Sequence, residues 1–271
     1  MKPAEILRDI QKLPKKLLGQ NFLVDESVVR DMIAVAEIEL DDIIVEIGPG
    51  LGALTDDLAR RAKQVLAIEM DQELVHYLRM KKRRKVKIIH GDALKIDWTV
   101  TLEGPYRIVA NIPYSITSPL LRKIFLLDKK PTKVVLLVQK EMAVRITAEP
   151  GSSERGFLTL LCEAAAETKI VRTVKPGSFY PRPKTNSAII VLTPRPDNRA
   201  SQIFWPAVEA GFRHKRQILA NALSKDLRLK KSQVIEILEV VGLPALCRAQ
   251  NLTFEDWVKL ASPLQTAINQ L

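Results

Sequence analysis

Short runs of β-branched and other apolar residues alternate with helical patterns along the first half of the chain, and this alternation constrains the fold more than any other feature. The expected strands are Ile43–Ile47, Val65–Ile68, Val86–Ile89, Ile108–Ala110 and Val134–Val138. The helical patterns between them cover Leu54–Ala62, Leu74–Met80 and Leu120–Leu127. Strands that alternate with helices are joined by right-handed crossovers and form a mostly parallel sheet with helices on both faces. We therefore expect an α/β domain.

The pattern changes near residue 193. Before this point, the strand candidates Ile170–Val174 and Ser187–Leu192 flank a proline-rich loop. After Pro194 and Pro196 only helical patterns follow, and they cover Phe204–Phe212, Arg216–Ser224, Ser232–Val241 and Phe254–Ala261. Prolines in a polar segment are typical of a domain boundary. The sequence predicts an α/β domain over residues 1–193 and a small all-helical domain over residues 194–271.

The chain is basic, with a formal net charge of +11 over 271 residues. The excess gathers in three clusters, which are Arg79–Lys87, the group Lys12, Lys15 and Lys16, and Arg213–Arg216. Lysine and arginine side chains near phosphates release condensed counterions, so clustered positive charge indicates a polyanion partner. Any one cluster could instead be a solvated face. The total charge favours nucleic acid.

Composition argues against several other classes of protein. Cys162 and Cys247 lie far apart and match no metal or redox spacing, and none of the three histidines is near another histidine or a cysteine. We therefore expect reduced core thiols and no metal site. No stretch approaches the roughly 18 apolar residues of a membrane span, and the N-terminus lacks a signal-peptide core. These features favour a cytoplasmic protein with no membrane partner.

A glycine-rich turn follows the first expected strand of the sheet, in Glu46-Ile-Gly-Pro-Gly-Leu-Gly. Gly48, Gly50 and Gly52 allow a tight turn, let a ligand approach the backbone and leave N–H groups free at a helix start. Glu69 ends the second strand, where a carboxylate can accept hydrogen bonds from ribose hydroxyls. Asp92 follows the third strand, where it can accept from the exocyclic amine of adenine. This set fits either NAD or S-adenosylmethionine.

The segment Asn111-Ile-Pro-Tyr, at the end of the fourth expected strand, distinguishes between these ligands. The N6 amine of adenine is a poor nucleophile because its lone pair is delocalised into the ring. The Asn111 amide oxygen and the Ile112 carbonyl can accept its two N–H bonds and hold the nitrogen in line with a methyl sulfonium. Pro113 makes the turn rigid, and Tyr114 can stack on the purine face. The segment therefore indicates methylation of an exocyclic amine on a planar base.

Motifs in order over nearly the whole chain carry a resemblance to a known family. They are Gly19-Gln-Asn-Phe-Leu, Glu46-Ile-Gly-Pro-Gly-Leu-Gly, Asn111-Ile-Pro-Tyr, Gln139-Lys-Glu-Met-Ala, Phe179-Tyr-Pro-Arg-Pro-Lys and Phe212-Arg-His-Lys-Arg-Gln-Ile-Leu-Ala-Asn-Ala-Leu. Together they resemble the KsgA/Dim ribosomal RNA adenine dimethyltransferases. The resemblance implies a Rossmann-like class I methyltransferase sheet and S-adenosylmethionine as the methyl donor. It also implies 16S rRNA, within the 30S subunit or its precursor, as the partner, with two adjacent adenines near its 3′ end converted to N6,N6-dimethyladenine. The sequence shows no exposed heptad or apolar stripe, so we expect a monomer.

The resemblance also assigns roles to residues by their position in these motifs. Those implied to bind the donor are Asn21, Leu23, Gly48, Gly50, Glu69, Asp92 and Asn111. Those implied at the target base are Asn111, Tyr114 and Phe179, with the two aromatic rings on opposite faces of the base. Such stacking makes physical sense because an extruded base loses stacking energy that aromatic faces can return. Those implied to hold the rRNA backbone, at the start of a helix, are Arg213, Lys215 and Arg216, and a solvated helix end is the alternative for them.

Three other functions stay open at this point. Asn111-Ile-Pro-Tyr and Lys184-Thr-Asn-Ser lean toward the Erm relatives, which methylate large-subunit rRNA, whereas the basic segment 212–223 and the longer C-terminal domain favour the small-subunit enzyme. A non-catalytic RNA-binding assembly factor of the same fold is disfavoured because Asn111, Glu69 and the glycine turn are present. An NAD enzyme is disfavoured because no residue pairing for hydride transfer accompanies the strand ends.

Ser153-Glu-Arg-Gly-Phe-Leu departs from the family pattern and puts RNA contacts there in question.

Overall fold

The computed structural model describes residues 3–10, 13–15, 19–195 and 204–270. Lys12 and Lys16 of the expected basic cluster, and Pro196 of the expected boundary, lie outside the described residues. The chain divides into two compact units. Unit 1 comprises Met1–Ala143 and Thr168–Pro194, and unit 2 comprises Val144–Glu167 and Arg195–Leu271.

This division differs from the predicted ranges of 1–193 and 194–271 chiefly in residues 144–167, which group with unit 2. Helix α7 (Phe157–Ala165) lies in this segment. Its residues Leu160 and Ala164 are part of the hydrophobic core of unit 2, so their burial places the segment there although it precedes two strands of the sheet.

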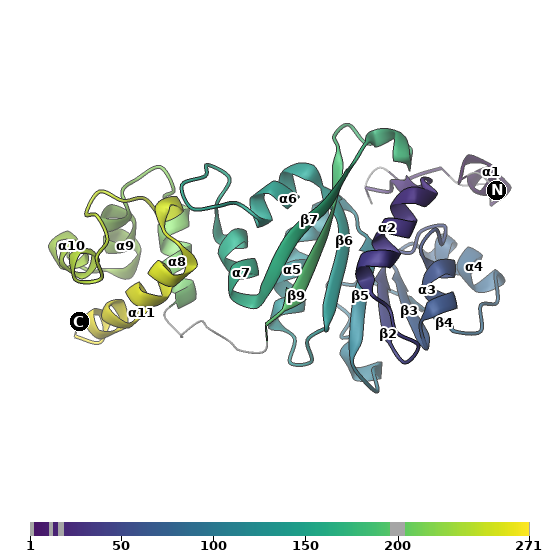
Figure 1. Ribbon diagram of the computed structural model, residues 1–271, viewed down its shortest axis with the longest axis horizontal. Helices are drawn as coiled ribbons and strands as arrows, with labels where there is room; N and C mark the ends of the chain where they lie inside the picture. Colours follow the sequence, from purple (N-terminus) through teal and green to yellow (C-terminus); the bar gives the residue numbers. More distant parts are fainter. Residues whose placement is uncertain (1–2, 11–12, 16–18, 196–203, 271) are drawn as a thin grey trace. The chain divides into compact units, whose positions relative to one another are not determined.

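The predicted α/β fold is confirmed, with a seven-stranded sheet in the order β4-β3-β2-β5-β6-β9-β7 (Figure 1). The strands are β2 (Ile43–Ile47), β3 (Gln64–Glu69), β4 (Val86–His90), β5 (Tyr106–Asn111), β6 (Lys133–Gln139), β7 (Ala166–Val174) and β9 (Ser187–Pro194). Strands β2 to β6 pair in parallel, whereas β9 is antiparallel to β6. The chain order reverses between β2 and β5, and ligands of open α/β sheets bind at the carboxyl ends of strands at such a point.

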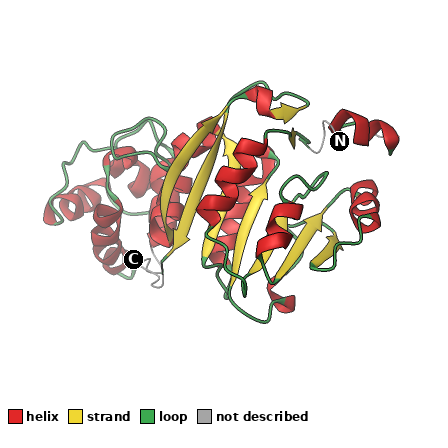
Figure 2. Ribbon diagram, turned by 45° about the vertical axis from the view of Figure 1, so that its right-hand side comes forward, coloured by secondary structure: helices red, strands yellow, loops and turns green. Residues whose placement is uncertain are grey.

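Helices cover both faces of the sheet (Figures 1 and 2). They are α2 (Glu26–Ala36), α3 (Thr55–Arg61), α4 (Gln72–Met80) and α5 (Thr117–Leu126). Helix α2 begins after Asp25, whose side chain accepts a hydrogen bond from the Ser27 N–H at 2.9 Å and so caps the helix. The fully buried Met32 of α2 and Leu58 of α3 share one core cluster with Val109 of β5. This core fixes the strand ends relative to one another.

A two-stranded sheet, which the sequence analysis did not predict, joins the N-terminal segment to the proline-rich loop. Strand β1 (Phe22–Leu23) is antiparallel to β8 (Phe179–Tyr180), with Phe22 opposite Tyr180 and Leu23 opposite Phe179. Strands of two residues are too short to show a period, so only the tertiary contact reveals them. The other elements that begin before β9 are α1 (Pro3–Asp9), η2 (Thr99–Thr101), η3 (Tyr114–Ile116), α6 (Lys140–Ile146) and η4 (Pro176–Ser178).

Unit 2 is helical. Besides α7 it contains α8 (Phe204–Arg213), α9 (Leu219–Leu227), α10 (Lys231–Val240), η5 (Ala249–Asn251) and α11 (Phe254–Ile268). The predicted helix Arg216–Ser224 was wrong at its start, because residues 214–218 form a turn before α9. The buried Trp257 packs so closely on α8 that a Cβ at Gly211 would lie 2.6 Å from its ring. A glycine is therefore required at this helix crossing.

Arg155 explains the departure from the family pattern at residues 153–158. Its side chain is fully buried in unit 2 and donates to both carboxylate oxygens of Glu163 at 2.7 Å. It also donates to the carbonyls of Ala148 at 2.8 Å and Leu252 at 3.0 Å. Arg155 is thus a structural residue, which satisfies several buried acceptors at once.

Candidate active site

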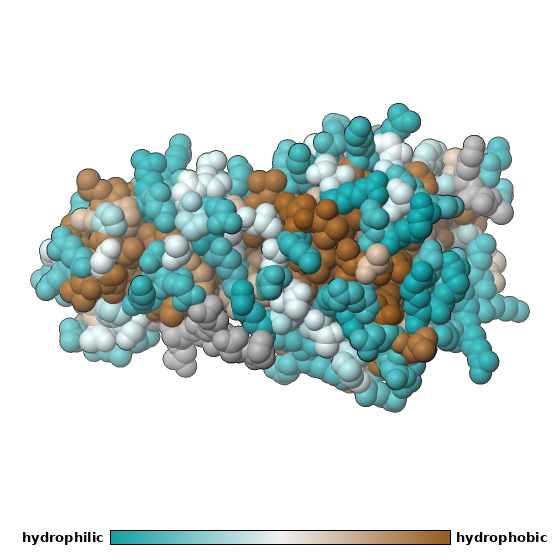
Figure 3. Space-filling model, viewed as in Figure 1, coloured by the Kyte–Doolittle hydropathy of each residue, from teal (hydrophilic) through white to brown (hydrophobic). Residues whose placement is uncertain are grey.

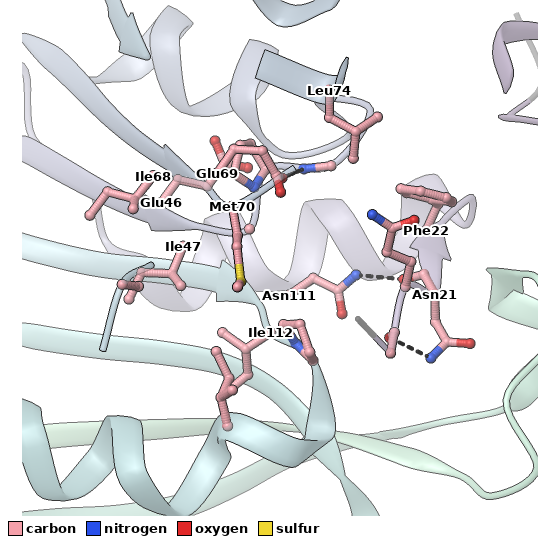
Figure 4. Close-up of a pocket in the computed structure, with 18 of the residues that line it drawn as sticks. Asn21, Phe22, Glu46, Ile47, Ile68, Glu69, Met70, Leu74, Asn111 and Ile112 are labelled. Atoms are coloured by element: carbon pink, nitrogen blue, oxygen red, sulfur yellow. Dashed lines mark hydrogen bonds between the residues drawn. The ribbon is translucent and has the colours of Figure 1, made fainter. Parts of the chain in front are cut away.

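A pocket of about 1000 Å³, partly open to solvent, lies at the carboxyl ends of β2, β3 and β5. Its walls are the glycine turn after β2, the ends of β3 and β4, the Asn111–Tyr114 segment and the N-terminal residues 19–23. Figure 4 shows that these side chains come from separate elements and converge on one space. The pocket occupies the crevice where the strand order reverses.

The glycine turn needs its glycines for two different reasons. Gly48 and Gly50 have φ values of 66° and 59°, in the left-handed region, and both line the pocket. A Cβ at Gly50 would lie 3.1 Å from the Phe22 ring. Gly52, with φ 88°, does not line the pocket, and a Cβ there would lie 2.9 Å from an Arg83 guanidinium nitrogen. The first two glycines therefore shape the pocket, whereas the third permits packing behind it.

Glu69, at the end of β3, is held by backbone groups. One carboxylate oxygen accepts from the Gly50 N–H at 3.1 Å and the other from the Asp71 N–H at 2.9 Å. Burial raises the pKa of the Glu69 carboxyl above its ordinary value, although these N–H groups oppose the shift. Each oxygen keeps a further lone pair. The carboxylate therefore has a fixed orientation and can still accept hydrogen bonds from a ligand.

Asp92 lies in the loop after β4 and lines the pocket beside Glu69. One of its oxygens accepts from the Leu94 N–H at 2.9 Å. Lys123, from α5, holds this loop in place by donating to the carbonyls of Ala93, at 2.9 Å, and Ile96. Its ammonium group also lies 4.4 Å from the centre of the Trp98 ring. The helix that follows the Asn111 segment thus anchors the loop that carries Asp92.

Asn111 is oriented by the N-terminal segment. Its amide N–H donates to the Asn21 carbonyl at 3.0 Å, and the Asn21 side chain donates to the Gly19 carbonyl at 3.1 Å (Figure 4). This bond leaves the Asn111 side-chain oxygen as the free acceptor, and no donor to it is found in the part of the chain that the structure describes. The Ile112 carbonyl also has no hydrogen-bond partner among the described residues, although Ile112 is only 2 % exposed. Two oxygen acceptors are thus available at the end of β5.

Tyr114 lines the pocket and is fixed through its hydroxyl, which lies 2.6 Å from the hydroxyl oxygen of Ser187. Ser187 begins β9 and is fully buried. Burial raises the pKa of the Tyr114 hydroxyl, so the phenol stays neutral. The sequence analysis missed Ser187 because nothing local relates it to a tyrosine that lies 73 residues earlier.

All the residues that the sequence analysis assigned to donor binding line this one pocket. They are Asn21, Leu23, Gly48, Gly50, Glu69, Asp92 and Asn111. Phe179 does not line it, and at 2 % exposure this ring packs in the core of unit 1. Phe179 lies opposite Leu23 in the small sheet, and both side chains belong to the core of unit 1, although Leu23 also lines the pocket. The structure therefore does not place Tyr114 and Phe179 on opposite sides of the pocket.

Glu46 is a pocket residue that the sequence analysis quoted but did not assign. Its carboxyl group is fully buried, and one oxygen has no hydrogen-bond partner. Burial raises the pKa of this carboxyl to about 8. The signal was present in the sequence, because an acid inside the apolar run Ile43–Ile47 must be buried in a parallel strand.

The predicted RNA-binding residues lie at the end of α8 and in the turn after it, not at the start of a helix as expected. Arg213 pairs with Asp226 at 2.9 Å, and Lys215 donates to the Ser153 carbonyl. Arg216 is exposed, and its side chain has no partner among the described residues. Of the three, Arg216 is thus the side chain most available to a phosphate.

The basic run Arg79–Lys87 is partly structural. Arg83 pairs with Asp56, Arg79 donates to the Ile88 carbonyl, and Lys85 donates to the Ala62 carbonyl. The run lies on α4, β4 and the loop between them, and hydrophilic side chains dominate the surface at that end of unit 1 in Figure 3. Part of the positive charge in this run is therefore used in bonds within the protein, and these residues do not require a nucleic-acid partner to explain them.

The structure describes residues 3–10, 13–15, 19–195 and 204–270. Within these ranges no helix is both long and apolar enough to cross a membrane. In the same part of the chain, no group of three or more histidine, cysteine, aspartate or glutamate side chains is arranged to hold a metal ion.

Known proteins resemble the chain over nearly its whole length. The family model described as ribosomal RNA adenine dimethylase matches residues 12–265. A protein named ribosomal RNA small subunit methyltransferase A from Clostridium botulinum (strain Kyoto / Type A2) is 38% identical over 269 residues, which cover 96% of this chain and 98% of that protein. A protein of the same name from Moorella thermoacetica is 36% identical over 276 residues, covering 96% of each chain.

Solved structures resemble the fold of the chain. A dimethyladenosine transferase from Plasmodium falciparum is 26% identical with a TM-score of 0.78, covering 88% of this chain and 95% of that one. The 23S rRNA methyltransferase ErmE is also 26% identical, with a TM-score of 0.72 and coverage of 90% of this chain and 100% of that one.

Proposed function

The chain belongs to the ribosomal RNA adenine dimethylase family, as its motifs predicted, and from this membership we propose the reaction of its pocket. The protein is an rRNA adenine dimethyltransferase. It transfers methyl groups from S-adenosylmethionine to N6 of two adjacent adenines near the 3′ end of 16S rRNA, within the 30S subunit or its precursor. The chain aligns over nearly its whole length with relatives named ribosomal RNA small subunit methyltransferase A, and this favours the rRNA of the small subunit as the substrate.

The pocket has the groups that S-adenosylmethionine requires. Gly48, which lines the pocket, lets a ligand approach the backbone of the turn, and the fixed Glu69 carboxylate can accept from both ribose hydroxyls. Asp92 can accept from the adenine amine. Glu46 also lines the pocket, and its buried carboxyl group has one oxygen without a hydrogen-bond partner in the protein. When bound, the donor supplies an electrophilic methyl group on a sulfonium.

Asn111 and Ile112 orient the target amine. The Asn111 side-chain oxygen and the Ile112 carbonyl accept its two N–H bonds, which directs the nitrogen lone pair along the third direction, toward the pocket. The Asn21 carbonyl prevents the Asn111 amide from turning its N–H side to the target. Tyr114 stacks on the purine from a position fixed by Ser187.

One observation carries the proposal. The amide of Asn111 is held by the Asn21 carbonyl so that its oxygen stays free at the wall of a pocket that also contains Glu69 and Asp92. A strand-end asparagine with a purely structural role would use both sides of its amide within the protein. Arg216, exposed in unit 2, is available for the rRNA backbone.

A methyl-transfer assay tests the proposal. Purified protein, tritiated S-adenosylmethionine and undermethylated small subunits should give labelled N6,N6-dimethyladenine on nucleoside analysis, whereas large subunits should stay unlabelled. Label in large subunits alone would instead indicate methylation of 23S rRNA, the activity in the name of ErmE, whose structure the chain resembles. Binding of small subunits without any transfer would identify a non-catalytic assembly factor.

A further inference from the structure

Tyr180 is the most exposed aromatic side chain among the described residues, at 41 %. In β8 it lies directly opposite Phe22. Opposite residues of an antiparallel pair project to the same face with their Cβ atoms about 5 Å apart. Tyr180 therefore projects to the same face of the small sheet as the pocket-lining Phe22. The next pair, Leu23 and Phe179, projects to the other face, where both side chains belong to the core of unit 1 and Leu23 also lines the pocket.

The position of Tyr180 is tied to the candidate catalytic amide. Phe22, its partner across the small sheet, follows Asn21, and the Asn21 carbonyl accepts the hydrogen bond from Asn111. The Val24 N–H continues the ladder by donating to the Ser178 carbonyl at 2.9 Å. The Tyr180 ring therefore lies on a short two-stranded ribbon that continues directly into the residue that holds Asn111.

The chain around Tyr180 is positively charged and contains no acid. No aspartate or glutamate occurs between Glu167 and Asp197. In this stretch the side chains of Lys175, Arg182 and Lys184 are exposed and have no partner among the described residues. An exposed aromatic ring between unpaired cations is the combination that binds single-stranded nucleic acid, because the ring stacks on a base while the cations contact phosphates.

We propose that Tyr180, with Lys175, Arg182 and Lys184, is a docking surface for unpaired RNA next to the target adenine. The ring stacks on a base beside the target, and the cations hold the phosphates on either side. A paired duplex presents no free base face, so the surface selects unpaired RNA. This inference rests on the proposed function. It adds that the RNA next to the target adenine must be unpaired.

Fluorescence of 2-aminopurine tests the stacking. The probe is a short single-stranded RNA with two adjacent adenines and 2-aminopurine beside them, bound to the full chain. Stacking on Tyr180 should quench the probe, and Tyr180→Ala should abolish that quenching and weaken binding about five-fold or more. Tyr180→Phe keeps the ring and should behave as the unsubstituted protein. Val100→Ala, which truncates another exposed apolar side chain, is the matched control.

The salt dependence of binding tests the cations. Replacing Lys175, Arg182 and Lys184 together by alanine should lower the slope of log K against log salt by about 0.7 for each phosphate that is no longer neutralised. The same change at the exposed Lys63 and Lys95 of unit 1, which lie outside the three basic clusters, should leave the slope unchanged. The same RNA annealed to its complement should show neither the quenching nor the dependence on Tyr180.

Two outcomes overturn the inference, namely Tyr180→Ala with unchanged quenching and affinity, or equal binding of the annealed RNA. S-adenosylhomocysteine binding and methyl transfer to small subunits are measured in parallel on the unsubstituted protein. Failure there refutes the proposed function. Success there, together with an inert Tyr180→Ala, refutes only the docking surface.

Discussion

At the scale of single residues, the polar groups of the pocket are oriented by the backbone. The Glu69 carboxylate is held by the N–H groups of Gly50 and Asp71, and the Asn111 amide by the Asn21 carbonyl. Groups that are already oriented need no reorganisation during a reaction, which is the main source of electrostatic catalysis. The residue predictions concern this fixed geometry.

The first prediction concerns Asn111. Asn111→Ala removes the side-chain oxygen that we propose accepts from the target amine. We expect the rate of methyl transfer to fall by about 10²–10³, the usual cost of one positioned hydrogen-bonding group. Donor affinity, measured with S-adenosylhomocysteine by calorimetry, should change much less. Turnover close to that of the unsubstituted protein would remove the role assigned to Asn111.

The second prediction concerns the pair Tyr114 and Ser187. Removing either hydroxyl, by Tyr114→Phe or Ser187→Ala, should cost about 0.5–1.5 kcal/mol in kcat/KM, because the ring loses its fixed position. The double variant should lose no more than the worse single variant, since both changes break one hydrogen bond. Fully additive losses would show that the two hydroxyls act independently.

The third prediction uses the pKa of Glu46, which burial raises to about 8 from an ordinary value of 4.5. Between these values the unfolded protein is ionised at this site while the folded protein keeps the proton. Stability should therefore fall as pH rises from about 4.5 to 8, by about 1.4 kcal/mol per pH unit from this group. Glu46→Gln should remove this contribution to the pH dependence of the free energy of unfolding, which urea denaturation measures. The exposed Glu141→Gln is the control, and identical profiles for both variants would contradict the prediction.

At the scale of elements, the N-terminal segment 19–24 connects the parts of the pocket. Its Gln20 side chain donates to the Asp71 carboxylate at 3.0 Å, next to the bonds that hold Glu69. Its Phe22 ring covers Gly50, and its β1 strand pairs with β8. The glycine turn, the residues that hold Glu69, and β8 are thus joined by the few residues of segment 19–24.

The fourth prediction tests this connection. Gln20→Ala removes the partly buried hydrogen bond to Asp71, worth about 1 kcal/mol, and the exposed one from the Lys15 N–H. It should weaken S-adenosylhomocysteine binding about five-fold. Hydrogen exchange should become faster over residues 19–24. The exposed Gln72→Ala is the matched control at the start of α4. Unchanged exchange in the Gln20 variant would mean that other contacts hold the segment.

At the scale of the whole molecule, two units have separate cores. The core of unit 1 joins α2 and α3 to the sheet. The core of unit 2 is formed mainly between its own helices and includes Trp257 of α11. Each unit is expected to respond to damage in its own core.

The fifth prediction follows from these separate cores. Arg155→Ala leaves Glu163 and the carbonyls of Ala148 and Leu252 without their donor, and each buried acceptor left unsatisfied costs about 1–3 kcal/mol. Proteolysis should therefore become faster in unit 2. Binding of S-adenosylhomocysteine in unit 1 should remain, which calorimetry can measure. Loss of that binding at the same temperature would show that the units unfold together.

The order of residue types along the chain was enough to predict the fold class and the position of the ligand crevice. Runs of β-branched residues must pair in a buried sheet, and residues that follow parallel strands meet at one edge. For this reason the glycine turn, Glu69, Asp92 and Asn111 could be placed together before their contacts were known. The family resemblance added the N-terminal residues Asn21 and Leu23 to the same pocket.

Long-range packing sets which side chains face the pocket and which support it from behind. The burial of Phe179 and the exposure of Tyr180 depend on pairing between β1 and β8, which lie more than 150 residues apart along the chain. The Tyr114–Ser187 bond and the Arg155 cluster also join distant segments. Local sequence does not identify such partners, because the direction of a side chain depends on the residues that pack against it in the folded chain.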